Sequence, residues 1–196
     1  MSDIKSAREL AMAKVNAMEQ PSEEERLSWK YVPEGEKIAA RYLKQEAELV
    51  NEINKFEAVV VKYVTRGAAD VLTRNISLPK NDIVRKNNKL AMDGIKAVKE
   101  DKVAVENILS RIRRVFAHYL EQGEQQRKQA YASLKANFEA KIRQALQQQY
   151  GSVPNVKIDV ESQPQFQEEW RKMQAQLDSQ YLKLLEEYRQ ELTALK

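Results

Sequence analysis

Residues 98–149 decide the fold, and they read VKEDKVAVENILSRIRRVFAHYLEQGEQQRKQAYASLKANFEAKIRQALQQQ. This stretch contains no proline, and its apolar side chains recur every three or four positions from Val105 to Ala145, which is the period of an α-helix. A helix of this length would extend over about 75 Å, several times the length of the usual helix. A compact domain of 196 residues cannot enclose such a helix, so we expect the other segments to pack along its sides.

The composition predicts an all-α fold. Charged residues make up 32% of the chain, and glycine and proline occur only five times each, which is typical of long helices or coiled coils. We expect elongated antiparallel helical hairpins that share one long central helix, with coiled-coil-like packing. The chain has no cysteine, so disulfides, thiolate catalysis and cysteine metal sites are excluded, and a reducing compartment suits it. No signal-peptide pattern or membrane-spanning apolar run is present, so we expect a cytoplasmic protein that does not enter a membrane.

Three parts are expected along the chain. Residues 1–33 form an N-terminal arm with two short helices. Residues 34–120 form an N-terminal helical hairpin, and residues 121–196 form a C-terminal one that contains a loop at 150–164. Since two helices bury less surface than four, the C-terminal hairpin should rest on other helices or pair with a second copy of the chain.

Capping residues and prolines predict where the helices begin and end. Ser22 is a helix cap, and the helix that it starts should stop before Pro33. The turn at Pro79 is short, so the helices before and after it should run antiparallel. Gly151 is a natural left-handed cap for the long helix, and Pro164 opens the last helix.

The remaining segments are assigned by their apolar pattern. We expect a short helix at 2–19 and one continuous helix over 34–75. Gly94 and the charged run at 99–102 mark either a break or a solvated turn between residues 82–97 and the 98–149 helix. We favour a continuous or gently kinked helix, because one glycine costs only about 1 kcal/mol in a helix. Residues 156–161 alternate apolar and charged side chains, which predicts either a small strand or an extended loop.

Two apolar surfaces are the best candidates for contacts with a partner. The last helix carries a stripe spaced by threes and fours, and the segment around residues 58–64 is apolar on most of its circumference, more than a surface helix needs. The candidate interface residues are Val59, Val60, Tyr63, Phe166, Trp170, Leu177, Tyr181 and Tyr188. Near the N-terminus, Trp29, Tyr31 and Val32 favour an apolar anchor of the arm over a recognition cluster.

The sequence motifs of known catalytic and cofactor sites are missing. The five glycines are never close together, so phosphate-binding and dinucleotide loops are absent. The only histidine is His118, and Val115 occupies the position where a di-iron bundle would need glutamate. Most carboxylates have a lysine or arginine within helical reach, as on an ordinary solvated face. We therefore predict a protein that is not an enzyme and that holds no cofactor or metal.

The middle of the chain is basic. Residues 61–120 carry 13 basic and 6 acidic side chains, a net charge of +7, although the whole chain has only +4. Around the Pro79 turn these side chains would gather at the tip of the hairpin, where they could bind phosphate backbones or an acidic protein. An ordinary solvated surface explains the same charges without a ligand. The candidate polyanion-binding residues are Lys62, Arg66, Arg74, Lys80, Arg85, Lys86 and Lys89.

Two functional hypotheses follow. The first is a non-enzymatic helical scaffold, adaptor or stalk-like protein that binds a protein partner or itself, most simply as a homodimer. The second is an accessory protein that binds nucleic acid through the basic tip.

Overall fold

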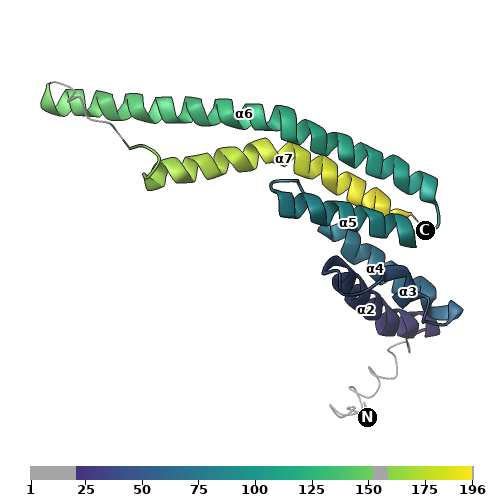
Figure 1. Cartoon of the computed structure of the whole chain (residues 1–196). Helices are drawn as coiled ribbons and strands as arrows, with labels where there is room; N and C mark the ends of the chain where they lie inside the picture. Colours follow the sequence, from purple (N-terminus) through teal and green to yellow (C-terminus); the bar gives the residue numbers. More distant parts are fainter. Residues whose placement is uncertain (1–20, 152–158, 196) are drawn as a thin grey trace, which may run out of the picture. The chain divides into compact units, whose positions relative to one another are not determined.

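The structure is a computed structural model that describes residues 21–151 and 159–195. Over these residues every regular element is an α-helix, so the protein is all-α, as the sequence predicts. The chain divides into two compact units between Ala68 and Ala69, inside α4. No helix in the described part combines the length and the apolar character that a lipid bilayer requires. The helices are α2 (Glu23–Leu43), α3 (Leu49–Ile53), α4 (Ala58–Asn75), α5 (Asp82–Val98), α6 (Lys102–Tyr150) and α7 (Pro164–Ala194) (Figure 1).

In the first unit, α2 and α4 touch through their backbones. A Cβ atom on Gly35 of α2 would lie 1.9 Å from the carbonyl oxygen of Val64, and one on Gly67 of α4 would lie 2.0 Å from the carbonyl oxygen of Val32. Only glycine leaves room for so close an approach. Small residues at 67–69 permit the close approach on α4, and Gly35 is the matching position on α2.

Helix α2 passes through Pro33, contrary to the prediction that it would stop there. Its start is as predicted, because the Ser22 hydroxyl accepts a hydrogen bond from the Glu25 N–H and the Glu25 carboxylate accepts one from the Ser22 N–H. A proline inside a helix costs about 3 kcal/mol. We attribute the continuation of the helix through Pro33 to the packing of the following turn, where Gly35 and Ile38 are buried. Helix α2 therefore runs across residue 33.

The single helix predicted over 34–75 is also wrong, because the chain breaks it twice. Helix α2 ends with Gln45 in the left-handed region, at φ 61°. The Gln45 N–H donates to the Tyr42 carbonyl at 2.8 Å and the Glu46 N–H donates to the Arg41 carbonyl at 2.9 Å, which is a Schellman motif. The short α3 follows, and residues 54–57 separate it from α4. Glycine is the usual residue at the left-handed position of this motif, so the glutamine at position 45 gave no sequence signal for it.

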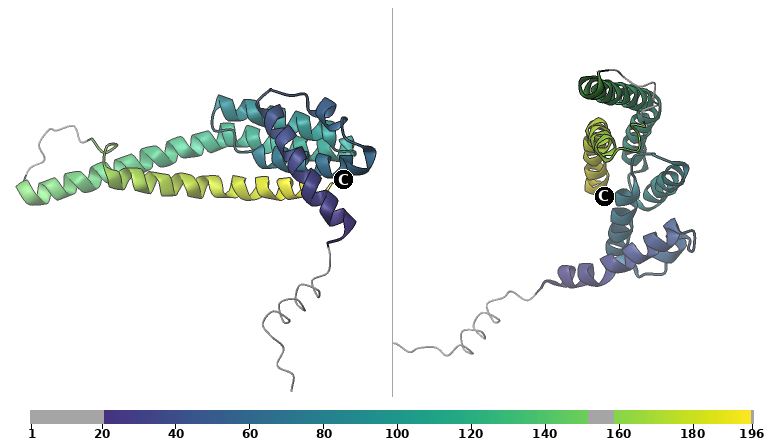
Figure 2. Two further views of the ribbon diagram at one scale, coloured as in Figure 1. Left: turned by 90° about the horizontal axis from the view of Figure 1, so that it is seen from below. Right: turned by 90° about the vertical axis from the view of Figure 1, so that its left-hand side faces the viewer.

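In the second unit, α6 and α7 form the long antiparallel pair that the sequence predicts (Figures 1 and 2). Near one end of the pair the Tyr131 ring lies edge-on to Phe166 with centroids 5.5 Å apart, and further along Tyr119 lies edge-on to Tyr181 at 5.1 Å. Helix α6 ends at Gly151 with φ 71°, and Pro164 is the first residue of α7, both as predicted. Helix α7 continues along α6 beyond the predicted start of the C-terminal hairpin at residue 121, because Arg111 contacts Tyr188 and Glu191.

Helices α5 and α6 are separate, so the expected continuity across residues 98–102 is wrong. Lys99 has an extended backbone, and the Asp101 carboxylate accepts hydrogen bonds from the N–H groups of Val103 at 3.1 Å and Ala104 at 2.8 Å. An aspartate in this position is a strong helix start. Helix α5 begins as predicted, because the Asn81 side chain accepts a hydrogen bond from the Val84 N–H.

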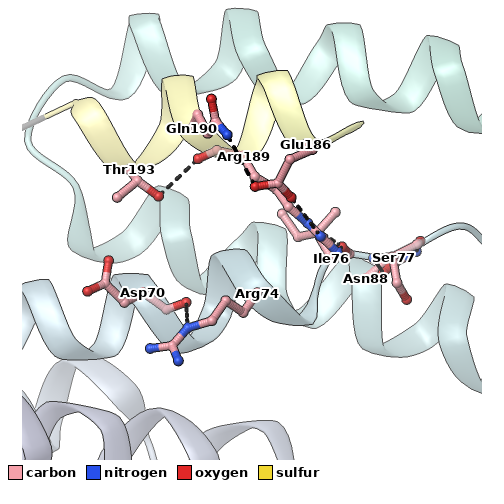
Figure 3. Close-up of polar contacts among 9 residues, drawn as sticks. All are labelled: Asp70, Arg74, Ile76, Ser77, Asn88, Glu186, Arg189, Gln190 and Thr193. Carbon is pink, nitrogen blue, oxygen red and sulfur yellow. Dashed lines mark hydrogen bonds and ion pairs between the residues drawn. The ribbon is translucent and has the colours of Figure 1, made fainter. Parts of the chain in front are cut away.

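The segment between α4 and α5 is packed into the second unit, so the basic tip predicted at Pro79 does not exist as a free end. Ile76, Leu78 and Pro79 are buried. The Asn88 side chain accepts from the Ser77 N–H at 2.8 Å and donates to the Ser77 carbonyl at 2.6 Å. The Arg189 guanidinium of α7 donates to the Ile76 carbonyl, with the Nε–O distance 2.9 Å (Figure 3).

Two predictions concern residues outside the described part. The helix expected at 2–19 lies there entirely, and so do residues 156–158 of the possible strand. Residues 159–162, which the structure does describe, form a loop and a turn.

Candidate functional site

A buried carboxylate on α7 anchors the segment before α5. Asp178 is only 5% exposed, and its Oδ2 atom lies 2.8 Å from the Lys80 ammonium. Its Oδ1 atom lies 3.6 Å from the Arg127 guanidinium of α6, and this guanidinium stacks on the Tyr119 ring at 4.2 Å from the centroid. Three segments of the second unit therefore meet at one negative charge.

The titration of this cluster is shifted by its surroundings. The hydrogen bond from Lys80 to Asp178 raises the pKa of the Lys80 ammonium, although partial burial acts against it. Burial, and then the charge of Asp178, raises the pKa of the Tyr119 hydroxyl. Both shifts favour the protonated forms in the folded state.

A cleft of about 700 Å³ opens beside this cluster. Four cationic side chains line it, together with the two carboxylates of Asp178 and Glu124 and uncharged residues that include Tyr119 and Gln174. We call it the ionic cleft. Its cationic residues are Lys80, Arg85, Arg127 and Arg171.

A second surface of the α6–α7 pair has the opposite character. A hollow of about 650 Å³ is lined by uncharged side chains, and we call it the neutral groove. It adjoins a smaller hollow of about 370 Å³, with which it shares His118, Tyr181 and Leu184. The neutral groove is lined by His118, Gln126, Ala130, Met173, Gln176, Leu177, Gln180, Tyr181 and Leu184.

Three of the predicted interface residues lie on this surface. Leu177 and Tyr181 line the neutral groove and Tyr188 lines the smaller hollow, and all three are half-buried. Trp170 is also half-buried, with its ring edge-on to Tyr131 at 5.0 Å.

The other predicted interface residues lie elsewhere. Phe166 is buried between Tyr131 and Phe138 in the chain's own core. Val60 and Tyr63 are buried, whereas Val59 is 68% exposed. Trp29 is 66% exposed, so the structure does not show the apolar anchor predicted for it.

The predicted polyanion-binding residues do not form one cluster within either unit. Lys62 and Arg66 precede the boundary at Ala68, and the other five follow it. Lys62 lies 3.4 Å from Glu24, and Arg85 lies 3.3 Å from Asp82. Arg74 donates to the Asp70 carbonyl at 3.2 Å (Figure 3). Of the seven, Lys80 and Arg85 reach the ionic cleft, and Lys86 and Lys89 are exposed on α5.

His118 of α6 contacts Tyr181 of α7. Its Nδ1 atom lies 2.9 Å from the Tyr181 hydroxyl, and the two rings are tilted with centroids 5.7 Å apart. The described residues hold no group of three or more acidic or histidine side chains placed to bind a metal ion.

Sequence reasoning did not identify Asp178 or Arg127. A signal for Asp178 is present, because Asp178, Leu185 and Leu192 are spaced by seven and all three are buried on one face of α7. A charged residue in such a row needs partners. Of the five predicted residues of α7, Leu177, Tyr181 and Tyr188 lie instead along the neutral groove and the smaller hollow.

The fold and these surfaces define an all-α protein that presents two unlike clefts on a long pair of helices. The chain belongs to a family of unknown function (DUF6657), whose model matches residues 50–194. Helices α4 to α7 and both clefts lie within the matched residues, and α2 precedes them. No curated protein and no solved structure matches the chain.

Proposed function

We propose that this protein is a non-enzymatic helical scaffold that pairs with a second copy of itself through the neutral groove. One observation carries the proposal: nine side chains line this groove without a single aspartate, glutamate, lysine or arginine, although 32% of the chain is charged. Depletion of charge is the compositional mark of the core of a protein interface.

The chemistry of the groove favours a second copy as the occupant. Leucine, methionine and tyrosine supply apolar surface, while Gln126, Gln176 and Gln180 carry amides that both donate and accept hydrogen bonds. A two-fold axis would bring this surface against itself without opposing like charges. A cytoplasmic location and a role as an adaptor or stalk-like element are part of this proposal.

Sedimentation velocity over a range of protein concentrations tests it. Wild-type protein should approach the dimer mass. Leu177→Glu should raise the dissociation constant at least about tenfold, because an unpaired carboxylate in an apolar interface costs more than about 1.4 kcal/mol. Leu182→Glu is the matched control, since Leu182 lies on the same helix, is 48% exposed and lines neither hollow. A wild-type monomer at every concentration would contradict the proposal, as would equal effects of the two substitutions.

Nucleic-acid binding is the second candidate, and the exposed row Arg85, Lys86 and Lys89 on α5 supports it. Reversal of these three side chains to glutamate should abolish binding of a short duplex, and the wild-type affinity should fall steeply with salt. Binding that ignores salt would exclude this function.

A further inference from the structure

The ionic cleft contains a hydrogen-bond acceptor without a donor. Asp178 Oδ1 is buried and has no hydrogen-bond partner among the described residues. The Arg127 guanidinium lies 3.6 Å from it, and the Tyr119 hydroxyl is a further donor against this carboxylate. The other carboxylate oxygen is satisfied by Lys80. A buried acceptor is rarely left unpaired, so a hydroxyl or amine placed here would gain a charge-assisted hydrogen bond.

The same cleft contains cationic donors that the chain does not fully use. Among the described residues Arg171 makes no ion pair within 4 Å, and its Nε donates to the Gln167 carbonyl at a long 3.4 Å. Among the described residues Arg85 forms an ion pair with the exposed Asp82 at 3.3 Å, and its charge also acts on Glu124 of the cleft. Guanidinium groups match the geometry of carboxylates and phosphates.

The acidic side chains of the cleft do not cancel these cations. Asp178 is shared by Lys80 and Arg127, and Glu124 lies 2.6 Å from Lys128, which does not line the cleft. Four cations against two carboxylates leave the lining with a net charge of +2. The volume of about 700 Å³ is in the range of small-molecule sites.

We propose that the ionic cleft binds a small organic oxyanion that carries a hydroxyl group. The oxyanion lies against Arg171 and Arg85, and the hydroxyl donates its proton to Asp178 Oδ1. A phosphate ester and a carboxylate share this chemistry. The site is distinct from the neutral groove, because no residue lines both.

Isothermal titration of the full chain with two matched pairs of probes tests the proposal. Glycerol 3-phosphate is compared with propyl phosphate, and glycerate with propionate, so that the two members of each pair share a three-carbon chain and differ only in their hydroxyl groups. In at least one pair the hydroxylated member should bind about tenfold more tightly, which corresponds to one charge-assisted hydrogen bond. The pair that shows the difference identifies the oxyanion. No binding by any probe, or equal affinities within both pairs, would overturn the proposal.

Two substitutions locate the binding. Arg171→Gln should weaken the tighter probe at least about tenfold, since it removes one charged partner of the oxyanion. Lys172→Gln is the control, because Lys172 is the next residue, is exposed and does not line the cleft. Arg171 is exposed as well, so neither substitution should unfold the chain. An unchanged affinity in Arg171→Gln would overturn the assignment.

Discussion

Helices α2 and α4 meet through backbone atoms, whereas α6 and α7 meet through side chains. At the first contact the atoms that face Gly35 and Gly67 belong to the backbone, which cannot move aside as a side chain can. At the second, rings such as Tyr119 and Tyr181 lie between the helices, and hollows lined by side chains of both helices lie along the pair. We therefore expect the first contact to tolerate almost no change, and the second to tolerate change and to present the surfaces that bind ligands.

The largest expected effect is at the backbone contact. Gly67→Ala should destabilise the first unit by about 3 kcal/mol or more, because the new methyl group would overlap the Val32 carbonyl oxygen. Urea denaturation measures the loss. Gly123→Ala is the control in α6, where a Cβ atom would meet the ends of flexible side chains, Arg127 at 3.1 Å and Tyr181 at 3.2 Å. Gly123→Ala should change the free energy of unfolding by less than about 1 kcal/mol. Equal losses of stability in Gly67→Ala and Gly123→Ala would contradict the difference between the two helix contacts.

The next effect concerns a buried polar part of the α6–α7 contact. Asp178→Asn should cost about 1–3 kcal/mol, because it removes the charge that Lys80 and Arg127 share. The cost is below that of a fully buried pair, since the Lys80 side chain is 58% exposed. Asp82→Asn breaks the exposed pair with Arg85 and should change stability by less than about 0.5 kcal/mol in the same urea series.

The C-terminal ends of α2 and α6 differ in the residue that adopts the left-handed conformation. Helix α2 ends with Gln45 at φ 61° and α6 ends with Gly151 at φ 71°, so only the second end has the residue that this conformation prefers. Gln45→Gly should stabilise the first unit by about 0.5–1 kcal/mol, and Gly151→Ala should destabilise α6 by about 1 kcal/mol. Thermal melting of both variants would show the opposite signs, and a loss of stability in Gln45→Gly would refute the account of this turn.

The smallest effect is a dependence on alkaline pH. The pKa values of Lys80 and Tyr119 are raised in the folded state, so the stability that they contribute is present below about pH 10 and is lost as the pH rises through the raised values. Asp178→Asn should lose less stability over this range than the wild type. Burial lowers the pKa of Lys99, which acts in the opposite direction, but it does so in both proteins and cancels in the comparison. Identical pH profiles would show that Asp178 does not cause the shifts.

Local signals allowed most of the fold to be predicted. The all-α class, the end of α6 at Gly151 and the start of α7 at Pro164 follow from periodicity and capping residues. The predictions failed where contacts between distant residues override local preference, or where an unusual residue occupies a helix end. Pro33 stays inside α2 beside the contact with α4, and the break after α2 uses a glutamine where glycine is usual.

The candidate site was only partly predictable for a related reason. Leu177, Tyr181 and Tyr188 were found from their helical spacing. The ionic cleft depends on Lys80, Arg127 and Asp178, which are far apart in the sequence and meet only after α7 folds back along α6.

A distance measurement between two copies tests self-association through the neutral groove. The chain has no cysteine, so Leu182→Cys provides a single spin-label position on α7 that is exposed and lines neither hollow. Pulsed electron–electron double resonance should detect a dipolar coupling to the label on a second copy, and Leu177→Glu in the same labelled chain should abolish it. Absence of any coupling in the labelled protein, or a coupling that survives Leu177→Glu unchanged, would contradict self-association through this groove.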